Sequence, residues 1–554
     1  MDPQKKIRVG ILINRASTSA WSYEVLKEIS ESDYAELVLV IYNGDERKKQ
    51  PKRLTINKFF SRFNYLLSYL YDRLDSRLFK AKQDAFKTFD LKELLSGIHS
   101  ITVVPDAKGL SQWFPRKDIE EIKKHNPDVL IRLGFSILKG EILTTARYGT
   151  WSLHHGDNKV NRGGPPGFWE IYFNQPVTGS ILQVLTEDLD NGTVLYKSYA
   201  ATHKYSVALN KNALYWKSGK FFTRKLKELY HDGFESLRTQ FYRDINFYDR
   251  PLYTRATNLQ MLNFFFRLFG KMLSKGIQNL FKRNQWFLLY AFNRTGEVTQ
   301  SMRKFKKLYP QSDRFWADPC LVFKDNKYYI FIEEKLDSHK DAHISVIEMD
   351  EKGNYQQPKK VLDTGYHLSY PFVFEYEGSW YMMPETKSKN SIEVYKCAGF
   401  PHQWEFHKTI LSDVKAVDPT LFNHNNKWWL FTGIADGNSI SRNDELFIFH
   451  STSPFGPWIP HEKNPVVSDV RRARPAGKII RYKNKIYRPS QDCSVTYGYG
   501  FRMNEIITLN EQAYEEQEID FIEPNWNKNM RGTHTFCFEH NLTVVDGFRK
   551  KWKF

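Results

Sequence analysis

Short apolar runs alternate with amphipathic segments through the first part of the chain. Apolar stretches predict strands over 7–14, 37–42, 101–104, 129–133 and 151–154. Apolar positions at helical spacing predict helices over 20–29 and 212–229. This alternation predicts a parallel sheet covered on both faces. Because ligands of such sheets bind beyond the carboxyl ends of the strands, residues just after the predicted strands are candidates for a site.

After residue 284 the pattern becomes that of an all-β region, with short aromatic-rich runs separated by polar turns. Each unit has a polar residue before proline or alanine, an apolar strand, a turn and an aromatic strand. The copies begin at Ala317, Tyr370, Val417, Arg474 and, more weakly, Gly532. A repeat of about 45 to 60 residues is typical of propeller blades. We therefore expect a five-bladed β-propeller, with four polar side chains directed into its channel: Asp318, Asp418, Arg474 and His534.

Residues 258–282 carry an apolar stripe at helical spacing, surrounded by lysine and arginine. Two interpretations stay open: a helix packed between domains, or a basic amphipathic helix in peripheral contact with a membrane. No apolar run of about 18 residues occurs, so we expect no membrane-spanning helix. The predicted division is a first domain over 1–235, a helical linker over 236–290 and the propeller over 291–554.

The chain has 554 residues, too many for a single core, and a formal net charge of +18. This charge favours phosphorylated substrates, folate-like polyanions, nucleic acid or an anionic membrane, and equally fits an ordinary basic surface. The four cysteines form no CxxC pair, so neither a metal site nor a disulfide framework is expected. Because the N-terminus lacks a signal-peptide pattern, we expect a cytoplasmic location, with the inner face of the membrane as an alternative.

Candidate acid–base chemistry is concentrated in residues 149–195. His154 ends one apolar run, a Gly/Pro-rich loop follows over 162–167, and Asp190 lies in a turn after the next apolar run, 180–185. A base and an acid would then lie at the ends of two strands that face one opening. Proton-transfer sites are usually built in this way.

The segments HHGD at 154–157, RGG at 162–164 and LDNG at 189–192 resemble the folate-dependent formyltransferases. This group includes methionyl-tRNA formyltransferase and the sugar N-formyltransferases. The resemblance covers roughly 5–230 and implies a Rossmann-like α/β domain that uses N10-formyltetrahydrofolate as one-carbon donor. It also implies that His154 is the base or oxyanion donor and that Asp190 orients it.

The family's catalytic asparagine is Ser152 here, which shortens the hydrogen-bonding group, and His155 is an additional candidate donor. By resemblance, Arg162 and Gly163 contact the substrate. The implied folate-binding residues are Leu133, Gly134, Phe135, Ile137, Leu138, Glu187 and Leu189.

The propeller resembles family 43 glycoside hydrolases and, more closely, the domain that precedes the glycosyltransferase domain of plant glucosamine inositolphosphorylceramide transferases. The segments that carry this resemblance are 367–386, 451–458, 463–466 and 488–498. The hydrolase pattern implies a base at Asp318 and a supporting aspartate at Asp418. Its acid glutamate would fall near Arg474, where no glutamate occurs, so hydrolysis is not expected.

A glycan-holding pocket made of Asp318, Asp418, Arg474 and Asp492 is the expected alternative to hydrolysis, with Glu385 as another carboxylate near the channel. The same polar residues could instead only tie the blades together.

These features together predict an N-formyltransferase that acts on an amino sugar linked to a nucleotide or a lipid, with the propeller recognising the carbohydrate. No nucleic-acid partner is expected, because the propeller stands where the family's tRNA-binding barrel would be. The alternatives are a catalytically inactive carbohydrate-binding or scaffold protein of glycan assembly, and a glycoside hydrolase or transferase that works from the propeller. The oligomeric state is left open.

Overall fold

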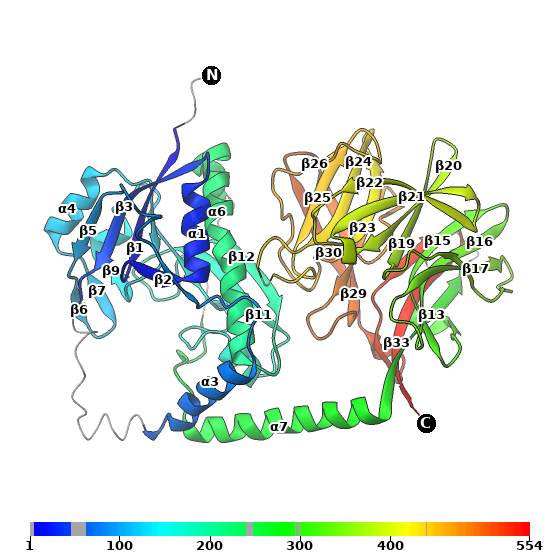
Figure 1. The fold of residues 1–554 in the computed structure, drawn as a ribbon, viewed down its shortest axis with the longest axis horizontal. Coiled ribbons are helices and arrows are strands. Elements are labelled where there is room, and N and C mark those ends of the chain that lie inside the picture. Colours follow the sequence, from blue (N-terminus) through cyan, green and yellow to red (C-terminus); the bar gives the residue numbers. More distant parts are fainter. Residues whose placement is uncertain are drawn as a thin grey trace. The chain divides into compact units, whose positions relative to one another are not determined.

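The structure is a computed structural model that describes residues 5–45, 63–239, 248–293, 295, 297–298, 301–438 and 440–553. The chain divides into two compact units. The first comprises Met1–Met272 with Gly437–Ile440, and the second comprises Leu273–Asp436 with Ser441–Phe554. Each unit has its own cores and is described by itself (Figure 1).

A seven-stranded sheet forms the centre of the first unit, in the order β12-β11-β10-β8-β1-β3-β5. Its strands are β1 (Ile7–Ile13), β3 (Ala35–Asn43), β5 (Ser100–Val103), β8 (Val129–Arg132), β10 (Thr150–His154), β11 (Val177–Val184) and β12 (Thr193–Ala201). The strands from β10 to β5 are parallel to one another, as predicted, whereas β11 runs antiparallel to both of its neighbours, β10 and β12. A strand that pairs in parallel with the strand before it needs a long crossover connection between the two. The connection after β10 holds only the short helix α5 (Phe168–Tyr172), so β11 starts at the edge where β10 ends.

Helices cover both faces of this sheet, as the alternating pattern predicts. Ile11 of β1 packs in one core with residues of α1 (Ala20–Ser30) and α6 (Val207–Thr239), which is interrupted at Gly233. Leu12 points the other way and packs with α4 (Arg116–Lys124). Smaller strands complete the unit: β2 (Ser17–Ser19) with β4 (Thr88–Asp90), and β6 (Asp106–Lys108) with β7 (Ser111–Trp113) and β9 (Ile137–Lys139).

The predicted linker over 236–290 is wrong at its far end. Helix α6 runs to Thr239, and α7 (Asn258–Phe281) forms where helical spacing predicts it. The next residues form β13 (Lys282–Phe292), which pairs along its whole length with β33 (Leu542–Trp552). The propeller therefore starts before residue 291, because the chain after α7 supplies a strand to it. No described helix is both long and apolar enough to span a membrane.

The second unit contains five antiparallel sheets among its described residues, in agreement with the five predicted blades. Four of these sheets each consist of four consecutive strands. The first is β15 (Arg314–Lys324), β16 (Lys327–Leu336), β17 (His343–Asp350) and β18 (Lys359–Leu362), and the second is β19 (Ser369–Tyr376), β20 (Ser379–Thr386), β21 (Ser391–Gly399) and β22 (Gln403–Leu411). The third is β23 (Ala416–His424), β24 (Lys427–Ile434), β25 (Leu446–Ser451) and β26 (Ile459–Pro460), and the fourth is β27 (Ile480–Tyr482), β28 (Lys485–Asp492), β29 (Gly500–Leu509) and β30 (Tyr514–Ile522). The fifth joins β13 and β14 (Lys306–Leu308) to β31 (Met530–Gly532), β32 (Phe536–Glu539) and β33. The two ends of the propeller sequence thus meet in one sheet.

Candidate functional sites

The sheet of the first unit brings His154 and Asp190 together. His154 is the last residue of β10 and is buried, and its Nδ1 lies 3.4 Å from Oδ1 of Asp190. Its Nε2 lies 3.2 Å from the backbone oxygen of Asn161. Asp190 also accepts the backbone N–H of Gly163 at 3.1 Å through Oδ2. The turn after β11 and the loop after β10 therefore meet at this pair.

The electrostatics of the pair favour the charged state. Burial lowers the pKa of His154, but the hydrogen bond and charge of Asp190 and the Asn161 carbonyl outweigh it, so this pKa is raised. Burial raises the pKa of Asp190, but His154 and the Gly163 N–H outweigh that effect and this pKa is lowered. Both ring nitrogens face acceptors, which suits a protonated imidazole. Of the two roles predicted for His154, the geometry favours the hydrogen-bond donor.

Ser152, also on β10, is held by a residue that sequence reasoning missed. Its hydroxyl accepts Nε of Arg132 at 2.9 Å, and Nη1 of Arg132 donates to the carbonyl of Ser136 at 3.0 Å. Burial lowers the pKa of Arg132, while the charge of Asp190 raises it in part. A guanidinium thus stands beside Ser152 in electrostatic reach of the pair. The only sequence signal is an arginine at the end of the apolar run before Gly134.

His155 does not add a donor to this site, and that prediction is wrong. Its ring stacks on Tyr215 of α6 at a centroid distance of 3.7 Å and contacts the edge of Trp21 of α1. Its Nδ1 lies 3.3 Å from the hydroxyl of Ser218. Burial among these rings lowers the pKa of His155 well below its ordinary value. Successive residues point to opposite sides of an extended chain, so His155 faces the helices while His154 faces Asp190.

Arg162 and Gly163, the predicted substrate contacts, are engaged within the protein. Arg162 donates from Nε to the Asn158 carbonyl at 2.9 Å, and from Nη2 to Oδ1 of Asn191 at 3.2 Å. Gly163 has a φ of 91°, and a Cβ there would lie 2.2 Å from the Tyr253 carbonyl oxygen. Both residues shape the loop that holds Asp190.

The predicted folate-binding residues lie on two loops that contact each other. Leu133, Gly134, Phe135, Ile137 and Leu138 follow β8, and Glu187 and Leu189 follow β11. Oε1 of Glu187 accepts the Gly140 N–H at 2.8 Å, and Lys139 donates to the Glu187 carbonyl.

The loop after β8 is also fixed to the end of β1. Asn14 accepts the Phe135 N–H at 2.9 Å, and a Cβ on Gly134 would lie 2.6 Å from the Asn14 nitrogen. The chain leaves β1 toward β3 on one side and returns as β8 on the other, which is where sheets of this kind bind ligands.

In the propeller, one backbone irregularity recurs in three blades. Asp318, Tyr370 and Asp418 each precede a proline and have φ values of 50°, 47° and 50°. In each case the pairing with the next strand shifts register at that point. Such bulges redirect a side chain. Glu333 and Glu385 occupy matching positions on β16 and β20, opposite the residue before each bulge.

These residues meet in a buried polar cluster. Arg474 donates to Asp418 at 2.5 and 2.9 Å and lies 3.2 Å from Glu385. His534 lies 3.4 Å from Asp318 and 2.5 Å from Asp546. Asp318, Asp418, Arg474 and His534 thus lie in the cluster, as the repeat predicts.

Asp492, the fourth predicted glycan contact, bonds instead to Ser494 and Arg502, at 2.6 and 2.7 Å. Its strand ends there, and its side chain is directed to the neighbouring strand β29 rather than to Arg474.

The crowding of carboxyl groups shifts their protonation. Burial, then the charges of Asp318 and Glu385, raises the pKa of Glu333 well above its ordinary value. Burial raises the pKa of Asp418 to about 8, although Arg474 opposes this. Burial also opposes ionisation of Glu385, but the charges of Arg474 and Lys387 and the hydrogen bond to Asp418 together outweigh it and lower the pKa of Glu385. Burial and the neighbouring carboxyl groups thus favour the protonated form of Glu333 over the charged one. Sequence reasoning missed Glu333, because it lies on the second strand of its blade.

This cluster is nearly closed to solvent. Asp418 is 1% exposed and Arg474 6%. Tyr497 covers it: its ring lies 4.9 Å from the Arg474 guanidinium carbon, and its own exposed fraction is 47%.

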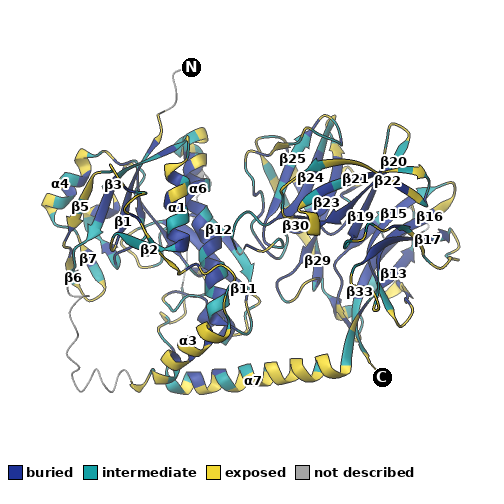
Figure 2. Cartoon of the chain, viewed as in Figure 1, coloured by how far each residue is buried: buried dark blue, intermediate teal, exposed yellow. Residues whose placement is uncertain are grey.

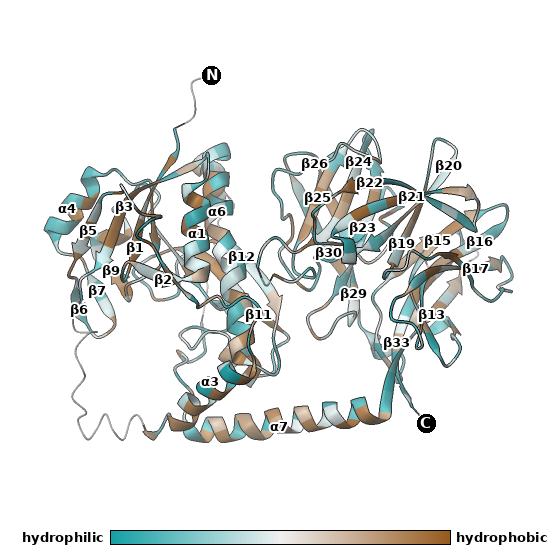
Figure 3. Cartoon of the chain, viewed as in Figure 1, coloured by the Kyte–Doolittle hydropathy of each residue, from teal (hydrophilic) through white to brown (hydrophobic). Residues whose placement is uncertain are grey.

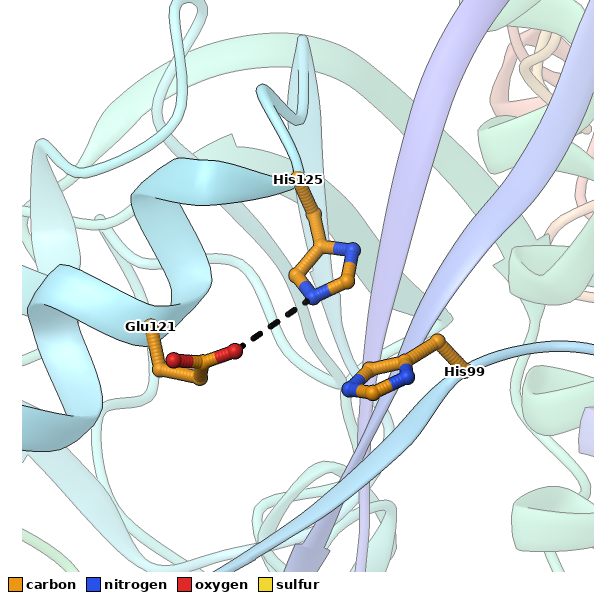
Figure 4. A group of neighbouring side chains, drawn as sticks. All are labelled: His99, Glu121 and His125. Carbon is orange, nitrogen blue, oxygen red and sulfur yellow. Dashed lines mark ion pairs between the residues drawn. The ribbon is translucent and has the colours of Figure 1, made fainter.

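Two groups among the described residues have ligand atoms close enough to hold a divalent cation. One is buried and consists of Asp318, His534 and Asp546. The other is His99, Glu121 and His125, whose ligand atoms lie within 4.8 Å of one another near the end of α4 (Figure 4). Its imidazole rings stack at 4.5 Å, and Oε2 of Glu121 is paired with Lys124 at 2.7 Å. None of the three residues of this second group lies on β10 or in the 189–192 turn, so the group is separate from the His154–Asp190 pair.

Comparison with known proteins finds a family match in the second unit. Residues 303–552 match the family model "Glucosamine inositolphosphorylceramide transferase 1, N-terminal". The rice protein glucosamine inositolphosphorylceramide transferase 1 (Oryza sativa subsp. japonica) is 35% identical over 215 residues, which are 38% of this chain and 28% of the rice protein. The match thus spans well under half of that relative. This likeness lies over the C-terminal half of the chain.

Two further likenesses are weaker. A methionyl-tRNA formyltransferase from Chlorobium chlorochromatii (strain CaD3) is 29% identical over 94 residues, which are 17% of this chain and 28% of that protein. The solved structure of CoXyl43, a GH43 β-xylosidase/α-arabinofuranosidase from a compost microbial metagenome, has a TM-score of 0.33 at 15% identity. It covers 43% of this chain and 90% of that chain.

Proposed function

We propose that this protein transfers a formyl group from N10-formyltetrahydrofolate to the amine of an amino sugar carried by a nucleotide or a lipid. The observation that carries the proposal is the His154–Asp190 pair at the carboxyl end of β10, beside the two predicted folate loops. The Chlorobium relative, whose name is that of a formyltransferase, supports the reaction type. The predicted folate loop after β8 lies where the chain order reverses, with β3 on one side of β1 and β8 on the other. This position supports a Rossmann-like formyltransferase fold.

Two buried side-chain atoms in the loop that follows His154 support a substrate site. Nδ2 of Asn158 and Oδ1 of Asn161 have no hydrogen-bond partner within the described part of the chain. Buried polar atoms are seldom left unpaired, because each costs about 1 to 3 kcal/mol. A bound substrate would satisfy both. In this chain Ser152 takes the place of the catalytic asparagine of the formyltransferase family. The side-chain amide of Asn158 would supply the N–H donor that this replacement removes.

Formyltetrahydrofolate would supply an activated formyl carbon, and the chain would supply the hydrogen bonds. In the reaction the amine nitrogen bonds to that carbon, the bond to N10 breaks, and one amine proton ends on N10. Protonated His154 would exchange its bond to Asn161 for one to the formyl oxygen as negative charge develops there. Asp190 would keep the imidazole protonated, and Oδ1 of Asn161 would orient the amine by accepting a hydrogen bond from it while the amine proton passes to N10.

The propeller would recognise the carbohydrate. The name of the rice relative contains glucosamine, an amino sugar, and the family match lies in this unit. Tyr497 would stack on a sugar ring, held from beneath by Arg474. The closed carboxyl cluster favours a binding role over hydrolysis, because a glycosidase needs two accessible carboxyl groups flanking the bond.

Calorimetric titration with a non-reactive N10-formyltetrahydrofolate analogue tests the proposal, followed by formylation assays on nucleotide-linked amino sugars. We expect micromolar binding by the wild type and by Ser152→Asn. His154→Ala should bind within a few-fold but lose about 10²- to 10³-fold in kcat. His231→Ala, an exposed histidine of the same unit, is the matched control and should behave as wild type. Absence of binding by both wild type and Ser152→Asn would contradict the proposal.

A further inference from the structure

Helix α7 turns an apolar stripe toward solvent. Four side chains of the first unit, spaced three or four residues apart, are each 57% to 81% exposed: Leu259, Leu262, Phe266 and Phe269. Figures 2 and 3 show this helix as largely exposed and rich in hydrophobic residues. We call these residues the α7 stripe. On another side of the helix, Met261 and Phe264 are buried in a core with Phe168 and Trp169. One apolar side thus packs the N-terminal part of the helix into the first unit, and the stripe stays exposed among the described residues.

Helix α3 (Leu66–Leu78) adds a second stripe beside the first. Four leucines spaced four residues apart are 43% to 76% exposed: Leu66, Leu70, Leu74 and Leu78. Helix α3 lies beside the N-terminal part of α7 within the first unit (Figure 1). The ring of Tyr71 meets that of Phe264 at 5.2 Å, and Arg255 bridges to Asp72 at 2.6 Å. The α7 stripe and these leucines together form what we call the two-helix face.

The exposed apolar side chains of the two-helix face indicate a surface that binds a partner. Soluble proteins rarely expose contiguous apolar patches above a few hundred Å², and larger ones mark interaction surfaces. An amphipathic helix whose apolar side faces solvent is typical of segments that lie in the interface plane of a bilayer.

The charges on the two helices favour an anionic lipid surface. Arg73 and Arg77 alternate with the exposed leucines of α3, and no described residue pairs with their guanidinium groups. The two acids of α3 are engaged: Asp72 with Arg255, and the buried Asp75 with the Ala208 N–H at 2.6 Å.

Helix α7 contains lysine and arginine but no aspartate or glutamate, and the chain carries a net charge of +18. Two copies joined through this face would bring like charges together, whereas anionic lipids would neutralise them.

We propose that the two-helix face docks on an anionic membrane surface, with α3 and α7 lying flat in the interface. The stripes enter the acyl boundary, and the arginines of α3 contact lipid phosphates and carboxylates. The inference stands independently of formyl transfer, because it uses none of the residues of the His154 site. Neutral vesicles would retain only the apolar contribution and bind more weakly.

Co-sedimentation of the full chain with phosphatidylcholine vesicles, with and without phosphatidylserine, tests the proposal. We expect Phe266→Glu/Phe269→Glu to weaken binding to anionic vesicles by at least about tenfold, since two exposed phenyl groups no longer enter the lipid. Val104→Glu/Leu110→Glu is the matched control: both residues are exposed in the same unit, and the charge change is identical. It should bind as wild type. Arg73→Gln/Arg77→Gln should weaken binding to anionic vesicles and leave binding to neutral ones unchanged.

Three results would overturn the proposal. The wild type does not sediment with anionic vesicles, or the Val104/Leu110 control loses as much binding as the Phe266/Phe269 variant. The third result is that the wild type does not bind vesicles and light scattering shows a dimer that Phe266→Glu/Phe269→Glu dissociates. That result would assign the face to a second copy of the chain. Circular dichroism and thermal melting of each variant establish that these exposed substitutions leave the fold intact.

Discussion

His154 and Asp190 stabilise each other because both are removed from water while keeping hydrogen bonds to the backbone. The order of residues along the chain suffices to predict this pair, since each follows an apolar run that ends at one sheet edge. Arg132 could not be predicted in the same way. Its place beside Ser152 depends on the pairing of β8 with β10, which no local pattern specifies.

The pair makes stability depend on pH in a defined direction. The folded pKa of His154 is raised above 6.5, so its contribution is fully present below pH 6.5 and is lost as pH rises through the folded value. The folded pKa of Asp190 is lowered below 3.8, so its contribution is present above pH 3.8 and is lost as pH falls through the folded value.

The excess unfolding free energy of the wild type over His154→Gln should therefore be largest between these two pH values. Urea titrations across pH measure it, with His231→Gln as an exposed control. A difference that stays constant from pH 4 to 9 would contradict the ion pair.

Among the elements, the bulge before proline is the part of the propeller that the sequence signals most clearly. A polar or aromatic residue followed by proline opens three blades, and each of these residues adopts a left-handed conformation that turns its side chain out of the strand register. The local signal locates the bulge. It does not indicate that Glu333 and Glu385 stand opposite, because strand pairing decides that.

At pH 9, above the pKa of about 8 of Asp418, Asp418→Asn should destabilise the propeller by about 3 kcal/mol, because Arg474 would be left buried without its bidentate carboxylate. Asp413→Asn is the matched control, since Asp413 is exposed and also has a positive φ of 55°. It should change stability by less than about 0.5 kcal/mol. Denaturation midpoints compare the two variants, and equal losses would show that Asp418 does not hold Arg474 in place.

For the whole molecule, closure of the propeller depends on residues that lie far apart in sequence. Strand β13 follows α7 directly and pairs with β33 near the end of the chain. Phe287 and Leu288 of β13 are buried in two different propeller cores. A boundary placed at 291 would remove these residues from the domain they complete.

A fragment of residues 282–554 should therefore fold cooperatively, whereas a fragment of 291–554 should not. The shorter fragment leaves β33 without most of its partner strand and opens both cores. Resistance to trypsin and the presence of a thermal transition distinguish them. If both fragments melt at the same temperature, the pairing of β13 with β33 is not needed for closure.

The sequence by itself determined the features that depend on neighbouring residues. Periods of 2 and 3.6, turns and X-Pro pairs act over a few residues, and they predicted the five parallel strands of the first sheet, α7, the five repeats and the His154–Asp190 pair. Only the tertiary structure decided which distant residues meet. Packing between elements decides that His155 faces the helices and that β11 is antiparallel. It also decides where the carboxyl cluster around Arg474 forms and that the α7 stripe is exposed among the described residues. Such packing sums many weak contacts over the whole fold, so no short segment contains its signal.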